Sequence, residues 1–124
     1  LFAILALLCS LPVRADEQAA PPRLSFAVEI KTGPQWDTAK GAADQAHFRQ
    51  HSANLKTLRD QGHLLVGARY ADKGLLIVQA ASLDDVHAMM KQDPSIQSQV
   101  FAYQVHEMNV FYGGAVPAKA PAKK

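Results

Sequence analysis

Apolar and polar residues alternate strictly in the segment 24–32, which reads LSFAVEIKT. The apolar side chains that would share one face of a strand are Leu24, Phe26, Val28 and Ile30. A second strand-like segment, 63–71, leads through the tight turn ADKG into the apolar run LLIVQA at 75–80. Two strand-length segments around a short polar turn predict a β-hairpin. Its first strand is expected to place four residues on one side: Leu64, Val66, Ala68 and Tyr70.

Helical spacing replaces the alternation in the segment between these strands. This helix is expected to begin with Asp44 as its N-cap and to end near Gln61, because Gly62 suits the position after a helix. The residues that share its buried stripe are Phe48, His51, Leu55 and Leu58. An ionisable ring on a stripe of apolar side chains is unusual, and it makes His51 the first residue to explain.

A second helix and a final strand complete the pattern. The segment 83–93 follows Ser82, a favourable N-cap residue, and stops before Pro94, since the residue before a proline avoids helical geometry. The last segment, 100–114, alternates again but loses its regularity at 106–108. We expect a β-bulge at that point, because one extra residue in a strand shifts the alternation.

The order of the elements is strand, helix, strand, strand, helix, strand, which is the ferredoxin-like βαββαβ order of an α+β domain. Right-handed crossovers would place both helices on one face of a four-stranded antiparallel sheet. The other face has no helix to cover it, although Ala27, Ala102 and Val110 belong to it. An open apolar face favours association, so we expect a homodimer that packs sheet against sheet.

Both ends of the chain differ in composition from this domain at 24–114. An apolar run, LFAILALLCSLPV, precedes the small-x-small pattern VRA, which predicts a signal peptide at 1–15, incomplete at its N-terminus and cleaved after Ala15. The segment 16–23 is then a linker, and the Ala/Pro/Lys segment 115–124 is expected to be disordered. These features predict a periplasmic or secreted bacterial protein with no transmembrane segment in its mature form.

Charge and composition narrow the possible functions. Residues 23–114 carry nine Lys or Arg and nine Asp or Glu, so the domain is formally neutral and has no basic stripe for nucleic acid. Cys9, the only cysteine, lies in the predicted signal, which leaves no thiol for catalysis or metal binding after cleavage. The glycines do not form a phosphate-binding loop, so we expect no cofactor.

Several motifs together resemble the YCII-related family over roughly residues 24–114. The matching positions are His51, Leu55 with Leu58, Gly62-His63-Leu64, Gly67, Ser82 and Asp93-Pro94. The resemblance implies a dimeric α/β barrel of ferredoxin-like subunits, with a pocket between sheet and helices and a catalytic His–Asp pair. One activity associated with the family is the removal of chloride from a chlorinated hydroxyquinol. Ala68 and Ser95 depart from the family pattern, which bears on the shape of the pocket.

The residues themselves supply a physical reason for pairing His51 with Asp93. A buried imidazole needs a hydrogen-bond partner, and Asp93 ends the second helix on the same face of the predicted sheet. A carboxylate would orient the ring and make it a general base near neutral pH. The alternative is a core histidine with a structural partner, and an Asp before a proline also forms turns.

Four further residues are candidates for binding a substrate: Trp36, Arg69, Ser82 and His106. Trp36 could close a long loop over a ligand or pack that loop on the domain, and Ser82 is also explained as a helix cap. Arg69 could bind an acidic ligand or border the dimer sheet. His47 and His51 have the spacing of metal ligands on a helix, but no third ligand is evident, so we expect no metal. His87 is expected on the solvated side of its helix.

Three functions fit these observations. The first is a cofactor-independent lyase or isomerase that acts on a small molecule with His51 as the general acid or base. The second is a non-catalytic module that binds a small aromatic or haem-like ligand, by analogy of fold alone. The third is a structural or interaction dimer.

Overall fold

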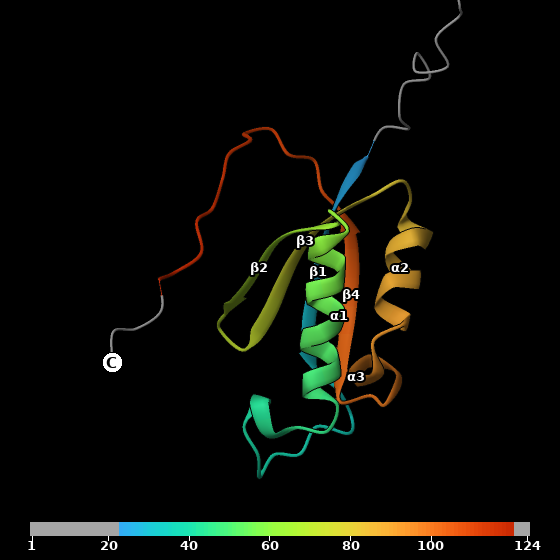
Figure 1. The fold of residues 1–124 in the computed structure, drawn as a ribbon, viewed down its shortest axis with the longest axis vertical. Helices are drawn as coiled ribbons and strands as arrows, with labels where there is room; N and C mark the ends of the chain where they lie inside the picture. The colour runs from blue at the N-terminus through green and yellow to red at the C-terminus, as the bar shows by residue number, and fades with distance from the viewer. Residues whose placement is uncertain (1–22, 121–124) are drawn as a thin grey trace, which may run out of the picture.

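The computed structural model describes residues 23–120 (Figure 1). The predicted signal peptide and all of the linker except its last residue, Arg23, lie outside the described residues. Residues 115–120 are exposed and belong to no helix or strand. The elements, in chain order, are β1 (Leu24–Thr32), η2 (Ala42–Asp44), α1 (Phe48–Asp60), β2 (Leu64–Tyr70), β3 (Lys73–Ala80), α2 (Leu83–Lys91), α3 (Pro94–Gln97) and β4 (Phe101–Glu107).

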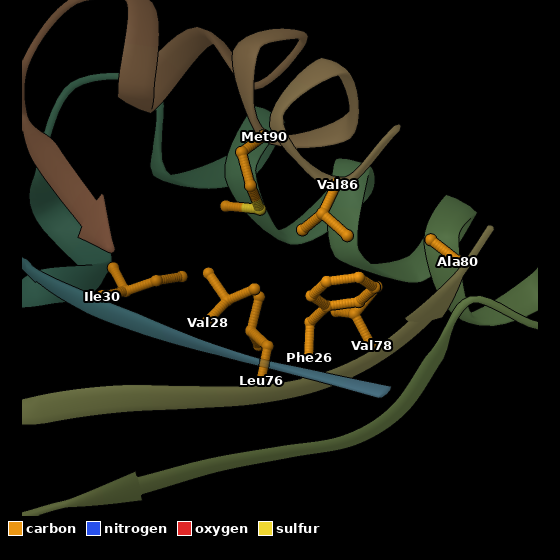
Figure 2. Packing of buried hydrophobic residues seen from close by; sticks show 8 residues of the cluster. All are labelled: Phe26, Val28, Ile30, Leu76, Val78, Ala80, Val86 and Met90. Carbon is orange, nitrogen blue, oxygen red and sulfur yellow. The ribbon is translucent and has the colours of Figure 1, made fainter. Parts of the chain in front are cut away.

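The four strands form one antiparallel sheet in the order β2-β3-β1-β4. Each of the two crossovers contains a helix and passes over one strand position: β1 connects through α1 to β2 across β3, and β3 connects through α2 to β4 across β1. The strands β1 and β3 are therefore adjacent at the centre of the sheet. Both long helices, α1 and α2, pack on the same face (Figures 1 and 2). The prediction of a ferredoxin-like α+β fold is therefore confirmed, with α3 added as a single turn after α2.

The core lies between the sheet and the helices. Figure 2 shows the strand residues pointing toward α2, whose Val86 and Met90 are fully buried. The buried members from the strands are Phe26, Val28, Ile30, Leu76, Val78 and Ala80. Their alternation in β1 and β3 follows directly from the period of two in the sequence. Burying each of the larger side chains stabilises the fold by about 1.5–3 kcal/mol.

The first helix begins three residues later than the sequence predicts. Asp44 closes the short 3₁₀ helix η2, and His47 is the N-cap of α1 with a left-handed φ of 65°. The reason lies in Gln45, a buried residue whose side-chain amide accepts from Asp37 N at 2.9 Å and donates to two backbone carbonyls of the loop. This amide holds the β1–α1 loop closed, so the chain must turn once more before the helix can start.

The β-bulge also lies in a different strand from the predicted one. The pairing of β1 with β4 is regular from Phe26 opposite Glu107 to Thr32 opposite Phe101. The irregularity is in β2, between Leu64 and Val66. The extra residue reverses the alternation of side chains after Leu64. The prediction that Val66, Ala68 and Tyr70 share a face of β2 with Leu64 is therefore wrong. Instead Gly67 and Arg69, which pair with Leu76 and Gly74, lie on the face toward the helices.

Candidate functional site

His51 lies on the inner side of α1, where only 8% of its surface remains exposed. It is in the first turn of the helix, and its ring packs near Phe101 at the start of β4, with 4.9 Å between ring centroids. Phe48, three residues earlier in the same turn, borders the ring with 6.3 Å between ring centroids. The helical stripe that the sequence predicts is thus correct, and it brings an imidazole against the end of the sheet.

Asp93 is positioned by the proline that follows it. Pro94 ends α2 and begins α3, and Asp93 becomes the N-cap of this short helix with extended backbone angles. Its Oδ1 accepts hydrogen bonds from the backbone N–H of Ser95 at 2.9 Å and from the Ser95 hydroxyl at 2.7 Å. The residue has no exposed surface. Its other oxygen, Oδ2, is therefore left to a partner across the domain.

That partner is His51, whose Nδ1 lies 2.5 Å from Asp93 Oδ2. The Ser95 hydroxyl, which is committed as a donor to Asp93, also lies 3.3 Å from the same Nδ1. Both neighbours therefore face Nδ1 as acceptors, so Nδ1 must carry the proton. In the neutral imidazole, Nε2 then has the free lone pair. The structure brings together the His–Asp pair that sequence and resemblance suggested.

The charge of Asp93 depends on opposing effects. Burial raises the pKa of its carboxyl group, but the hydrogen bonds from His51 and Ser95, together with the charge of His51, outweigh burial and lower this pKa below the ordinary value. The carboxylate is therefore ionised at neutral pH. An ionised partner holds the imidazole in one orientation and stabilises the ring when it takes up a proton.

A cleft of about 840 Å³ opens beside the imidazole. Its lining residues come from the end of β1, the start of β4, the turn of the β2–β3 hairpin and the start of α1. These parts of the chain meet at one end of the sheet (Figure 1). His51 lines it together with Trp36 and Phe101, whose rings are 5.5 Å apart. No residue among 23–120 forms a hydrogen bond with His51 Nε2. Asn54 Nδ2 is the only buried side-chain nitrogen or oxygen atom of these residues that lacks a hydrogen-bond partner, so Nε2 is not a buried atom. The free lone pair of His51 is therefore reached from the cleft.

The structure divides the four predicted substrate-binding residues into two pairs. Trp36 and Arg69 line the cleft beside His51. Ser82 instead accepts a hydrogen bond from Asp85 N at 3.2 Å as the N-cap of α2, and it does not line this cleft. His106 pairs with Ala27 on the face of the sheet away from the helices. His106 is not among the residues that line the cleft.

Two other histidines that the sequence analysis considered are His87 and His47. His87 was expected in solvent, but it is partly buried and its Nδ1 lies 2.7 Å from the hydroxyl of Tyr103 on β4. Burial raises the pKa of the Tyr103 hydroxyl, so this phenol stays protonated. His47 is exposed at the start of α1, and no group of three or more metal-binding side chains occurs among residues 23–120.

Sequence reasoning missed three residues of the site. The sequence places Phe48 in a helix and Phe101 in a strand, but it does not identify them as walls of a cleft. Ser95 was noted only as a departure from the family pattern, whereas it is fully buried and bonded to Asp93. The signal that could have identified it is the D-P-S sequence, because a serine two residues after an N-cap aspartate is within reach of the carboxylate.

The fold and the site define a ferredoxin-like α+β domain with a buried His–Asp pair at an aromatic cleft. The model of the YCII-related domain family matches residues 25–109, and the chain belongs to this family. No functionally curated protein matches the chain in sequence. Among solved structures, the chain is similar to 5-chloro-2-hydroxyhydroquinone dehydrochlorinase (TftG) from Burkholderia phenoliruptrix AC1100, in complex with 2,5-dihydroxybenzoquinone. That match has a TM-score of 0.53 and 23% identity, and covers 69% of this chain and 94% of the other.

The described part of the chain contains no helix with the length and apolar character needed to cross a membrane.

Proposed function

We propose that this protein is a small-molecule lyase or isomerase in which His51 is the general acid and base. One observation carries the proposal: His51 Nδ1 is bonded to a buried carboxylate at 2.5 Å, while the ring lines an open cleft. A histidine that only completed a core would have both faces packed. Here the orienting partner is buried and the reactive nitrogen is accessible, which is the arrangement that proton transfer requires.

The chemistry follows from the proton positions. His51 Nε2 accepts a proton from an acidic O–H or C–H group of the bound molecule, and the resulting imidazolium is stabilised by Asp93. The same nitrogen returns the proton to another atom in an isomerisation. In an elimination, the electron pair of the broken bond to hydrogen forms a new double bond, and a group such as chloride leaves with the electron pair of its own bond. Neither the isomerisation nor the elimination needs a bound cofactor. The reaction in the name of the structurally similar dehydrochlorinase is of the elimination type.

We propose that the protein acts as an exported homodimer. Support for the dimer comes from the sheet face away from the helices, where five neighbouring side chains are apolar or aromatic: Ala27, Ala68, Tyr70, Leu75 and Ile77. Support for export comes from the apolar segment and cleavage pattern before Asp16. Light scattering of wild type and Ile77→Asp tests the dimer, and N-terminal sequencing of protein expressed with its native leader tests cleavage.

The catalytic proposal is tested with His51→Asn and His51→Leu on a panel of chlorinated and hydroxylated aromatic compounds. 5-Chloro-2-hydroxyhydroquinone is the first substrate to try, with chloride release as the readout. Both variants should lose at least about 100-fold in turnover, the typical contribution of general acid–base catalysis, with unchanged far-UV circular dichroism. Wild-type turnover in His51→Leu would overturn the proposal.

A binding module without turnover is the second candidate, and the aromatic walls of the cleft favour it. Trp36, Phe48 and Phe101 offer apolar area to a planar ligand. Titration with haem distinguishes this candidate, because a bound haem gives a Soret band that shifts on binding. A saturable shift with no turnover on any compound of the panel supports a binding module and contradicts the enzyme.

A further inference from the structure

The side of the cleft opposite His51 carries an arginine. The bulge in β2 turns Arg69 toward the helix side of the sheet, where it pairs with Gly74 on β3. Gly74 in turn pairs with Ile30 on β1, whose side chain is buried under the helices. Gly74 has no side chain, so the floor of the cleft is low directly beside the arginine. Arg69 and Gly74 both line the cleft.

The cationic groups of the cleft differ in their partners. Three cations line it, Lys31, Arg69 and Lys73, and the one carboxylate in the lining is Asp72. Glu29, which lies outside the lining, forms ion pairs with both lysines, with N–O distances of 3.2 Å and 3.7 Å. The hydrogen bond from Lys31 is the main reason that the pKa of Glu29 is lowered. Arg69 has no ion-pair partner in residues 23–120.

The spacing of the strands separates Arg69 from Phe101, whose ring packs near His51. Arg69 lies on the edge strand β2, and Phe101, which stacks near His51, lies on the opposite edge strand β4. Three strand spacings of about 4.8 Å put the two backbones about 14 Å apart. The long arginine side chain and the aromatic rings extend into this interval from its two sides. The remaining space suits a single-ring ligand with one polar substituent directed at each side.

We infer that Arg69 binds a carboxylate of the ligand, so that the cleft takes a small aromatic acid with its reacting atom at His51. The planar guanidinium presents paired N–H donors that match the two oxygens of a carboxylate. The aromatic walls hold the ring between these groups. This inference rests on the proposed function for the location of the reacting atom, but the binding of the carboxylate does not depend on turnover.

Trp36 provides the measurement, because it is the only tryptophan of the chain and it lines the cleft. Its fluorescence is titrated with benzoate and with benzamide, which has nearly the same shape and no charge. Wild type should bind benzoate about tenfold or more tightly than benzamide, as expected for a hydrogen bond to a charged group. Arg69→Gln should bind the two compounds equally, with unchanged binding of benzamide.

Arg59→Gln is the matched control. Arg59 is an exposed arginine of α1 that borders a second hollow and does not line the cleft. This variant should keep the preference for benzoate. Any of three results would overturn the inference. Wild type could bind benzoate and benzamide equally, Arg69→Gln could keep the preference for benzoate, or both variants could lose that preference to the same extent. No turnover occurs in this titration, so its failure is separate from that of the proposed function, which the His51 variants test.

Discussion

The substitution Asp93→Asn tests how the site fixes the proton of His51. Asparagine has nearly the shape of aspartate, but one of its two terminal groups donates hydrogen bonds. Asp93 Oδ1 accepts from the N–H and the hydroxyl of Ser95, so the amide carbonyl must stay at that position. The NH₂ group then replaces Oδ2, 2.5 Å from His51 Nδ1. Since NH₂ donates, Nδ1 must become the acceptor, and the proton of the neutral ring moves to Nε2.

The expected change in stability follows from the bonds that are exchanged. A hydrogen bond to a charged group contributes about 1.5–3 kcal/mol and a neutral one about 0.5–1.5 kcal/mol. Asp93→Asn should therefore lower the free energy of unfolding by about 1 kcal/mol. Asp93→Ala leaves the donors of His51 and Ser95 without an acceptor in a buried place, and its cost should approach the 3–5 kcal/mol that is typical of broken buried pairs.

Two measurements check these expectations. Long-range ¹H–¹⁵N correlation spectra of the imidazole report which nitrogen carries the proton, and urea unfolding gives the free energies. The wild-type ring should be protonated on Nδ1 when neutral, and the Asp93→Asn ring on Nε2, with loss of any His51-dependent turnover. A variant ring that keeps its proton on Nδ1 would refute the reasoning. So would equal destabilisation by Asn and Ala.

Three further predictions concern the surroundings of the site. Ser95→Ala removes the 2.7 Å hydroxyl bond to Asp93 but keeps the backbone bond, and urea unfolding should show a loss of about 1.5–3 kcal/mol; an unchanged midpoint would contradict this. Gly33→Ala places a Cβ 2.2 Å from the carbonyl oxygen of Gln99, and thermal unfolding should show about 1–3 kcal/mol of destabilisation. Gly41→Ala, with nothing within 4 Å, is the neutral control. The pKa of Asp93 is lower in the folded state, so its contribution to stability is present above about pH 4 and is lost as the pH falls through the folded pKa. Urea midpoints between pH 6 and 2 should fall less steeply in Asp93→Asn than in wild type, and parallel curves would contradict this.

Regular parts of the fold were predictable because their sequence patterns are local. The alternation in β1 determines which side chains are buried, and the order of the elements limits the topology to a ferredoxin-like sheet. Ser82 and Gly62 mark helix ends by chemistry that acts within a few residues, and both hold in the structure. The stripe of α1 placed His51 on the buried side before any contact was known.

The errors share one physical cause, which is that contacts distant in sequence changed a local preference. Asp44 is a favourable helix start, but the buried amide of Gln45 holds the preceding loop and delays the helix to Phe48. The bulge in β2 has no local signature, because it adjusts the hairpin to the sheet, and it is what turns Arg69 into the cleft. His87 was assigned to solvent because Tyr103 is sixteen residues away.

The sequence by itself determined the order of the elements, the buried faces of the central strands and the presence of an ionisable ring on an apolar stripe. These are properties of neighbouring residues, where the period of a strand or helix decides what is buried. Only the tertiary structure decided what the ring does. Hydrogen bonds require distances within a few tenths of an ångström, and the pairing of His51 with Asp93 and Ser95 joins residues more than forty positions apart. The packing of α1 and α3 at one end of the sheet sets those distances and leaves a cleft beside the free nitrogen.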